Sequence, residues 1–354
     1  MRPNYRNKIG LKTLPSLLLV FFGQYSTLQA VDGQLQFSSY FDTNVRESLN
    51  VPESTFGLAT RGRLNHDISR QRTNVYGEIL AQVNLDAHFL GESKLIVNAD
   101  LDFQYTLNKS ICILGQLSHF QKSFYNRTGS YLWNEYNTFL RFLPTPRFSG
   151  WFGYRHRSKS LESKDKYRFG EDNLEFKGRY NIDPKIFLES TISRSNIDHM
   201  DFSAVEVADD TSLIFLGYPQ KDKGINGLFH LRYWGKVIIG VQLGIGVVES
   251  NSVIGEFSFV NYHAYLSGQL SPTIFYHVVF RRLDKAYQYP ALEGESKYRD
   301  PEEPTQNLTH IRLEKVLGNS YIGYVQMNLL QNETIYNHQY YDKTMIELGI
   351  KYEP

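Results

Sequence analysis

The chain has 354 residues, with 38 Lys and Arg, 37 Asp and Glu, and a single cysteine. This balance of charges excludes the strongly basic composition that is typical of nucleic-acid-binding proteins. One cysteine excludes an intrachain disulfide, so a fold of this size must rest on hydrogen bonds and packing.

The first 30 residues have the layout of a secretory signal peptide. A basic start (Arg2, Arg6, Lys8 and Lys12) precedes a short apolar stretch at 14–23, and Ala30 is a small residue before the expected cleavage. The apolar stretch is too short to span a membrane as a helix. Cleavage leaves 34 basic against 37 acidic residues, a net charge of −3, in the domain 31–354. We therefore expect an exported protein without a nucleic-acid partner.

From residue 34 to residue 353 apolar and polar side chains alternate in about 16 segments. At 94–108, for example, Leu95, Val97 and Leu101 alternate with Asn98, Asp100 and Asp102. A period of two predicts β-strands with one apolar and one polar face. Segments of about 10–14 residues exceed the usual strand of a soluble protein and match a tilted strand that crosses a bilayer. We expect strands at 34–44, 54–66, 73–86, 94–107, 110–121, 132–143, 148–157, 170–181, 185–197, 225–234, 236–249, 256–269, 273–285, 307–316, 319–331 and 342–353.

The connections between these strands tend to alternate in length. Short turns such as 107–109 and 182–184 are followed by longer polar segments such as 158–169 and 286–306, although 87–93 and 250–255 break the rule. Outer-membrane barrels have short periplasmic turns and longer outer loops. The sequence therefore predicts an all-β fold, a transmembrane antiparallel meander β-barrel of about 16 strands.

Two local segments sharpen this prediction. Residues 38–45 read SSYFDTNV, and Ile346, Leu348, Ile350 and Tyr352 alternate in a closing strand that contains Gly349. In these features the chain resembles the outer-membrane β-barrel proteins of Gram-negative-type bacteria. The resemblance implies an outer-membrane location, contact with outer-membrane lipid, and recognition of strand 342–353 by the barrel assembly machinery. Pro354 departs from the aromatic residue with which that family usually ends.

The alternation assigns a set of charged side chains to the interior of such a barrel. Clustered wall charges set selectivity in many channels. The alternative is that they are paired or hydrated wall residues that choose no solute. The candidates for lining the lumen are Arg61, Arg63, Asp100, Asp102, Glu135, Arg141, Arg155, Arg157, Glu175, Lys177, Arg179, Arg281 and Arg312.

The sequence allows more than one interpretation of two long segments. Residues 198–224 are expected as a loop, but its apolar stretch at 213–216 also fits a short hairpin, a plug or a partner site. The charged segment 289–304 is expected as a solvated outer loop, with an inward constriction as the alternative.

The sequence contains no G-x-S-x-G, H-E-x-x-H or Cys/His ligand motif. His66-Asp67 and Asp198-His199 are adjacent residues, which a strand points to opposite faces. We therefore expect no enzyme, cofactor or metal.

The predicted function is a porin-like passive or weakly selective channel for small solutes. A structural or surface-interaction barrel with a closed lumen is the alternative, and a hydrolase at the outer rim is a more distant one.

Overall fold

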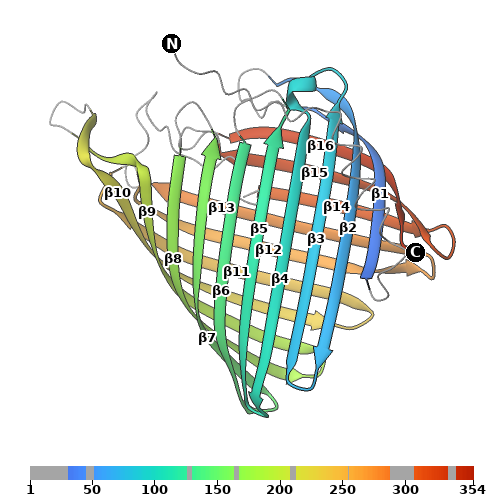
Figure 1. Ribbon diagram of the computed structural model, residues 1–354, viewed down its shortest axis with the longest axis horizontal. Coiled ribbons are helices and arrows are strands. Elements are labelled where there is room, and N and C mark those ends of the chain that lie inside the picture. Colours follow the sequence, from blue (N-terminus) through green and yellow to red (C-terminus); the bar gives the residue numbers. More distant parts are fainter. Residues whose placement is uncertain are drawn as a thin grey trace.

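The structure, a computed structural model, describes residues 31–44, 52–125, 130–162, 167–207, 213–253, 255–287, 307–333 and 340–354. These residues form sixteen antiparallel strands that close into one barrel, each strand paired with its neighbours in sequence (Figure 1). The predicted fold class and strand number are therefore confirmed. The expected signal peptide at 1–30 and the charged segment 289–304 lie outside the described residues.

The strands are between 10 and 22 residues long. They are β1 (Val31–Asp42), β2 (Thr55–Arg70), β3 (Thr73–Asp86), β4 (Lys94–Asn108), β5 (Ile111–Phe124), β6 (Ser130–Thr145), β7 (Phe148–Glu162), β8 (Tyr167–Asp183), β9 (Ile186–Val207), β10 (Leu213–Trp234), β11 (Val237–Ser250), β12 (Phe257–Ser271), β13 (Ile274–Tyr287), β14 (Asn307–Val316), β15 (Tyr321–Glu333) and β16 (Tyr340–Tyr352).

The largest difference from the sequence prediction concerns 198–224, which was expected as a loop. Most of this segment belongs to β9 and β10, each 22 residues long. Their pairing continues to Leu213 opposite Val207, with irregular register on both sides of Pro219. The loop prediction is wrong because strands that continue beyond the bilayer no longer need an apolar outer face. The hairpin alternative is confirmed, and Figure 1 shows the hairpin projecting beyond its neighbours.

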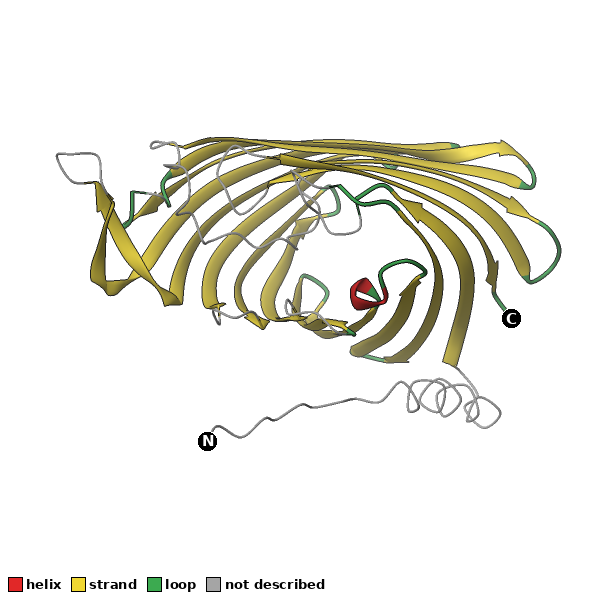
Figure 2. Ribbon diagram, turned by 90° about the horizontal axis from the view of Figure 1, so that it is seen from above, coloured by secondary structure: helices red, strands yellow, loops and turns green. Residues whose placement is uncertain are grey.

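The barrel closes through β1 and β16, which pair from Leu35 opposite Tyr352 to Asp42 opposite Met345. Val31 lies opposite His66, close to the short β2–β3 turn, so both described ends of the chain lie at the short-turn end. Seen from above, the ring is elongated, and the 3-10 helix η1 (Leu90–Glu92) lies within its outline (Figure 2). No helix among the described residues is long and apolar enough to cross a membrane.

The two faces of the wall differ sharply. Large apolar side chains point outward and remain exposed, as in Leu58 (62%), Ile192 (64%) and Leu348 (63%). The inner face carries polar side chains, including buried Gln36 and Asn173. A sheet that closes on itself satisfies every wall hydrogen bond without water, and an apolar outer face then suits hydrocarbon. The architecture is that of a membrane-spanning barrel.

Candidate functional site

The strand registers place all thirteen predicted lumen candidates on the inner face. Buried Gln36 defines that face and lies opposite Arg61, whose Nε donates to Gln82 at 2.8 Å. Because opposed residues in an antiparallel sheet share a face, the assignment passes from strand to strand around the ring. The candidates on this face are Arg61, Arg63, Asp100, Asp102, Glu135, Arg141, Arg155, Arg157, Glu175, Lys177, Arg179, Arg281 and Arg312.

Basic and aromatic side chains alternate along the inner face of β6–β10. The Arg179 guanidinium lies 5.4 Å from the centre of the Trp151 ring and 4.5 Å from that of Phe187. Arg232 continues the row, 4.3 Å from the centre of the Trp234 ring. Aromatic rings attract cations through their negative faces and hold guanidinium groups without neutralising them. We define the basic wall as the six cations Arg141, Arg155, Arg157, Lys177, Arg179 and Arg232. Lys159 extends the same face of β7, 5.7 Å from the centre of the Trp133 ring.

Carboxylates neutralise part of the basic wall. Arg157 lies between Glu135 and Glu171, at 3.2 and 3.4 Å. Glu189 accepts from Lys177 at 2.9 Å and from Arg179 at 2.7 Å. Three of the six cations are therefore paired.

The remaining three cations of the basic wall, Arg141, Arg155 and Arg232, have no ion pair among the described residues. The Nε of each is buried and has no hydrogen-bond acceptor within the described part of the chain. Arg155 lies between Asn137 on β6 and Asn173 on β7's other neighbour, β8, and both amides also carry buried polar atoms without partners. Burying a hydrogen-bond donor without an acceptor costs free energy, so these groups favour binding of an anion, another hydrogen-bonding ligand or water.

The inner face of β2–β4 carries charges of both signs. Arg63 pairs with Glu78 at 2.6 Å, which cancels one positive charge there. Asp100 accepts from the Asn98 amide at 2.6 Å, and neither Asp100 nor Asp102 forms an ion pair among the described residues. Excess negative charge on β4 therefore lies apart from the unpaired arginines of β6, β7 and β10.

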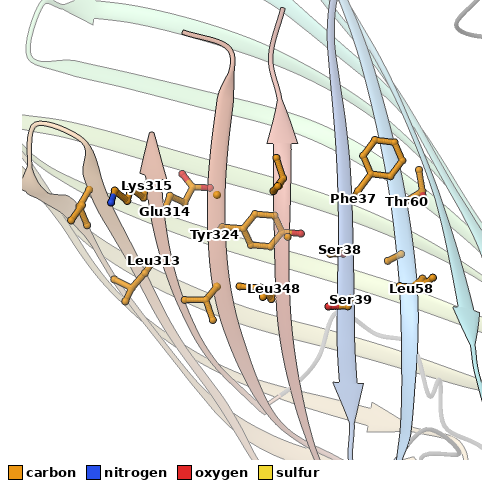
Figure 3. A pocket seen from close by; sticks show the side chains of 16 residues that line it. Phe37, Ser38, Ser39, Leu58, Thr60, Leu313, Glu314, Lys315, Tyr324 and Leu348 are labelled. Carbon is orange, nitrogen blue, oxygen red and sulfur yellow. The ribbon is translucent and has the colours of Figure 1, made fainter. Parts of the chain in front are cut away.

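A buried polar cluster joins the first strand to the last two. The Tyr324 hydroxyl donates to Glu347 at 2.5 Å and accepts from Gln36 at 2.5 Å, and Gln326 donates to Glu347 at 2.7 Å. We call Gln36, Tyr324, Gln326 and Glu347 the seam cluster. Figure 3 shows the Tyr324 ring extending toward Ser38 of β1, beside a groove of about 730 Å³. The ring passes over Gly349, where a Cβ would lie 2.5 Å from its oxygen.

A second buried cluster lies at the base of the projecting hairpin. His199 Nε2 and Asp222 Oδ2 are 2.6 Å apart, Ser250 donates to Asp222 at 2.5 Å, and Gln220 donates to it at 3.0 Å. From the sequence, His199 was interpreted as an ordinary polar residue at a strand end. Its pairing with Asp222 was not predicted, because both residues fall within 198–224, which was expected as a loop. Ser250 contacts the aspartate rather than the histidine, which is not the arrangement that activates a serine nucleophile.

One Ser–His contact does occur, on the inner face near the short-turn end. Ser267 Oγ and His277 Nδ1 are 2.5 Å apart. His277 also stacks edge-on with His310, but no carboxylate or amide orients its ring within the described part of the chain. The described residues contain no group of three or more His, Cys, Asp or Glu side chains arranged to hold a metal ion.

A scan against protein-family models gave no match, and neither did a search of curated proteins. Solved structures with a similar fold include Acinetobacter baumannii OccAB4, with 10% identity and a TM-score of 0.48 over 93% of this chain and 99% of that one. Pseudomonas aeruginosa OccK8 (OprE) has 8% identity and a TM-score of 0.46 over 92% and 98%. A mutant of the monoaromatic hydrocarbon channel TodX has 7% identity and a TM-score of 0.40 over 92% and 90%. Likenesses this distant carry no argument about the activity of this chain.

Proposed function

We propose that this protein is a passive channel for small solutes across the bacterial outer membrane. Sixteen strands enclose more space than the wall's own side chains fill, in contrast to an eight-stranded barrel. Interior ionic side chains agree with a hydrated lumen, since Arg63, Lys177 and Arg179 keep 44%, 30% and 36% of their side-chain surface accessible. The short turns and both described chain ends share one side, which fits a periplasmic side in outer-membrane barrels.

We further propose that the lumen favours anionic solutes. The observation that carries this proposal is the unpaired state of Arg141, Arg155 and Arg232, whose buried Nε donors lack acceptors in the described part of the chain. Arginine binds carboxylate and phosphate oxygens through paired donors, and low-dielectric surroundings strengthen that attraction. Of the inner carboxylates that form no ion pair among the described residues, Asp100 and Asp102 lie on another sector of the wall, whereas Glu175 lies on β8 within the basic wall.

Ion selectivity in planar bilayers tests this proposal. Under a KCl gradient, the reversal potential should give a PCl/PK ratio above one for the native protein. The triple variant R141Q/R155Q/R232Q should lower that ratio, because it removes the unpaired positive charge while preserving side-chain length. The matched variant D100N/D102N should raise it. A conducting native channel with a ratio below one, or two variants that shift it in the same direction, would contradict anion preference.

A further inference from the structure

The outer face of β9 and β10 carries two cations at the edge of its apolar band. Toward the short-turn end from Arg194, exposed Ile192 and Leu188 follow on the same face of β9. Toward the opposite end, the face becomes polar at Asn196 and Asp198. Arg194 is itself exposed, as is Lys223 on β10. These two side chains therefore lie where the wall passes from hydrocarbon to the head-group region.

The registers make the two cations neighbours. Arg194 lies opposite Leu174 on β8 and Ile225 on β10, both of them exposed apolar residues. Lys223 lies two residues from Ile225 on the same face, opposite Asn196. In an antiparallel pair, such diagonal positions are about 7–8 Å apart, within reach of long side chains on a common ligand.

Neither cation forms an ion pair among the described residues. Two nearby carboxylates have other partners. Asp172 accepts from Tyr154 and lies 2.8 Å from His156. Asp198 lies 3.4 Å from the Lys221 amine. Glu249 lies opposite Lys223 in the register, but the pair has no nitrogen-to-oxygen distance within 4 Å.

We infer that Arg194 and Lys223 together bind the phosphate group of an outer-leaflet lipid. A charged side chain beside hydrocarbon is costly unless its head reaches the interface, where long basic side chains meet lipid phosphates. Arg194 supplies paired donors for a phosphate, Lys223 adds a second charge, and Ile192 and Ile225 provide apolar surface for the acyl chains. The choice of leaflet rests on the outer-membrane orientation proposed above, because both cations lie toward the end opposite the short turns.

Native mass spectrometry of the detergent-solubilised protein tests this inference. The probes are a bis-phosphorylated glucosamine lipid (lipid A) and the same lipid after enzymatic dephosphorylation. The native protein should bind the phosphorylated probe more tightly, and R194Q/K223Q should weaken that binding about thirtyfold, from about 1 kcal/mol for each basic residue near an anionic surface. R282Q is the matched control, since Arg282 is an exposed outer-face cation already paired with Asp284 at 2.8 Å.

Equal affinity for the two probes would overturn the inference, as would an equal loss of affinity in R194Q/K223Q and R282Q. Circular dichroism and heat-modifiable gel mobility should show all three proteins equally folded. The bilayer conductance of R194Q/K223Q should match that of the native protein, because both side chains face away from the lumen. A failed lipid test with intact conductance would therefore reject this inference and leave the proposed channel untouched.

Discussion

Tyr324 and Glu347 form a buried hydrogen bond of 2.5 Å between the last two strands, and Gln36 of the first strand donates to both. Tyr324 and Glu347 are only 3% and 5% exposed. The bond therefore ties the closing strands to β1 at the point where the ring is completed.

Removing this hydroxyl should weaken the closure. We expect Y324F to lower the free energy of unfolding by about 1–3 kcal/mol, because Glu347 loses one donor while remaining buried. Y321F is the matched control, since Tyr321 on the same strand is half exposed and its hydroxyl forms no hydrogen bond in the described structure. Urea unfolding in lipid vesicles measures the stability of both variants, and equal stability would show that the Tyr324 hydroxyl does not stabilise the closure of the barrel.

Glycines on β11 make room for aromatic rings from β12. Gly240 lies opposite Tyr265, whose ring occupies the space that a Cβ at Gly240 would need. We expect G240A to cost about 1–3 kcal/mol through overpacking. G227A provides the comparison, because no atom lies within 4 Å of a Cβ there. The yields of folded protein in a refolding assay should separate the two variants; similar yields would show that the Tyr265 ring moves at little cost.

The exposed apolar wall should tolerate charge only near its edges. Val241 lies near the middle of β11 and is 55% exposed, whereas exposed Ser258 lies near the outer end of β12. We expect V241R to destabilise the barrel in bilayers by about 2–4 kcal/mol and S258R by about 1 kcal/mol or less. Equal effects in a vesicle-unfolding experiment would contradict the placement of β11 across the hydrocarbon.

The base of the projecting hairpin should depend on Asp222, which lies 2.6 Å from His199 Nε2 and accepts from Ser250 and Gln220. Breaking a buried pair by removing one partner costs about 3 kcal/mol or more. We expect D222A to speed proteolysis between residues 200 and 220 by at least about tenfold. D198N should have little effect, because Asp198 is 59% exposed. Unchanged cleavage in D222A would show that the hairpin is held by other contacts.

Most of the barrel could be predicted from the sequence because each bilayer-crossing strand alternates apolar and polar side chains. The strands at 73–86 and 307–316 match the structure at both ends, and the pairing of the first and last strands follows from the need to close the sheet. Segment 198–224 was missed because the ends of β9 and β10 lie beyond the band where lipid enforces that alternation. The residues on the inner face could be listed from the alternation of side chains along each strand alone.

Partners across strands could not be predicted in the same way. The sequence pattern does not distinguish Arg157, which is paired with Glu135 and Glu171, from Arg155, which has no ion pair. That difference depends on register and side-chain reach, and it decides where the wall keeps unneutralised charge.

Single-channel recording of the native protein in a planar bilayer tests the central claim most directly. We expect stepwise conductance that rises in proportion to salt concentration, because ions would diffuse through a hydrated lumen. A bilayer that stays sealed, although heat-modifiable mobility shows folded and inserted protein, would contradict the channel and favour a barrel that acts through its surface.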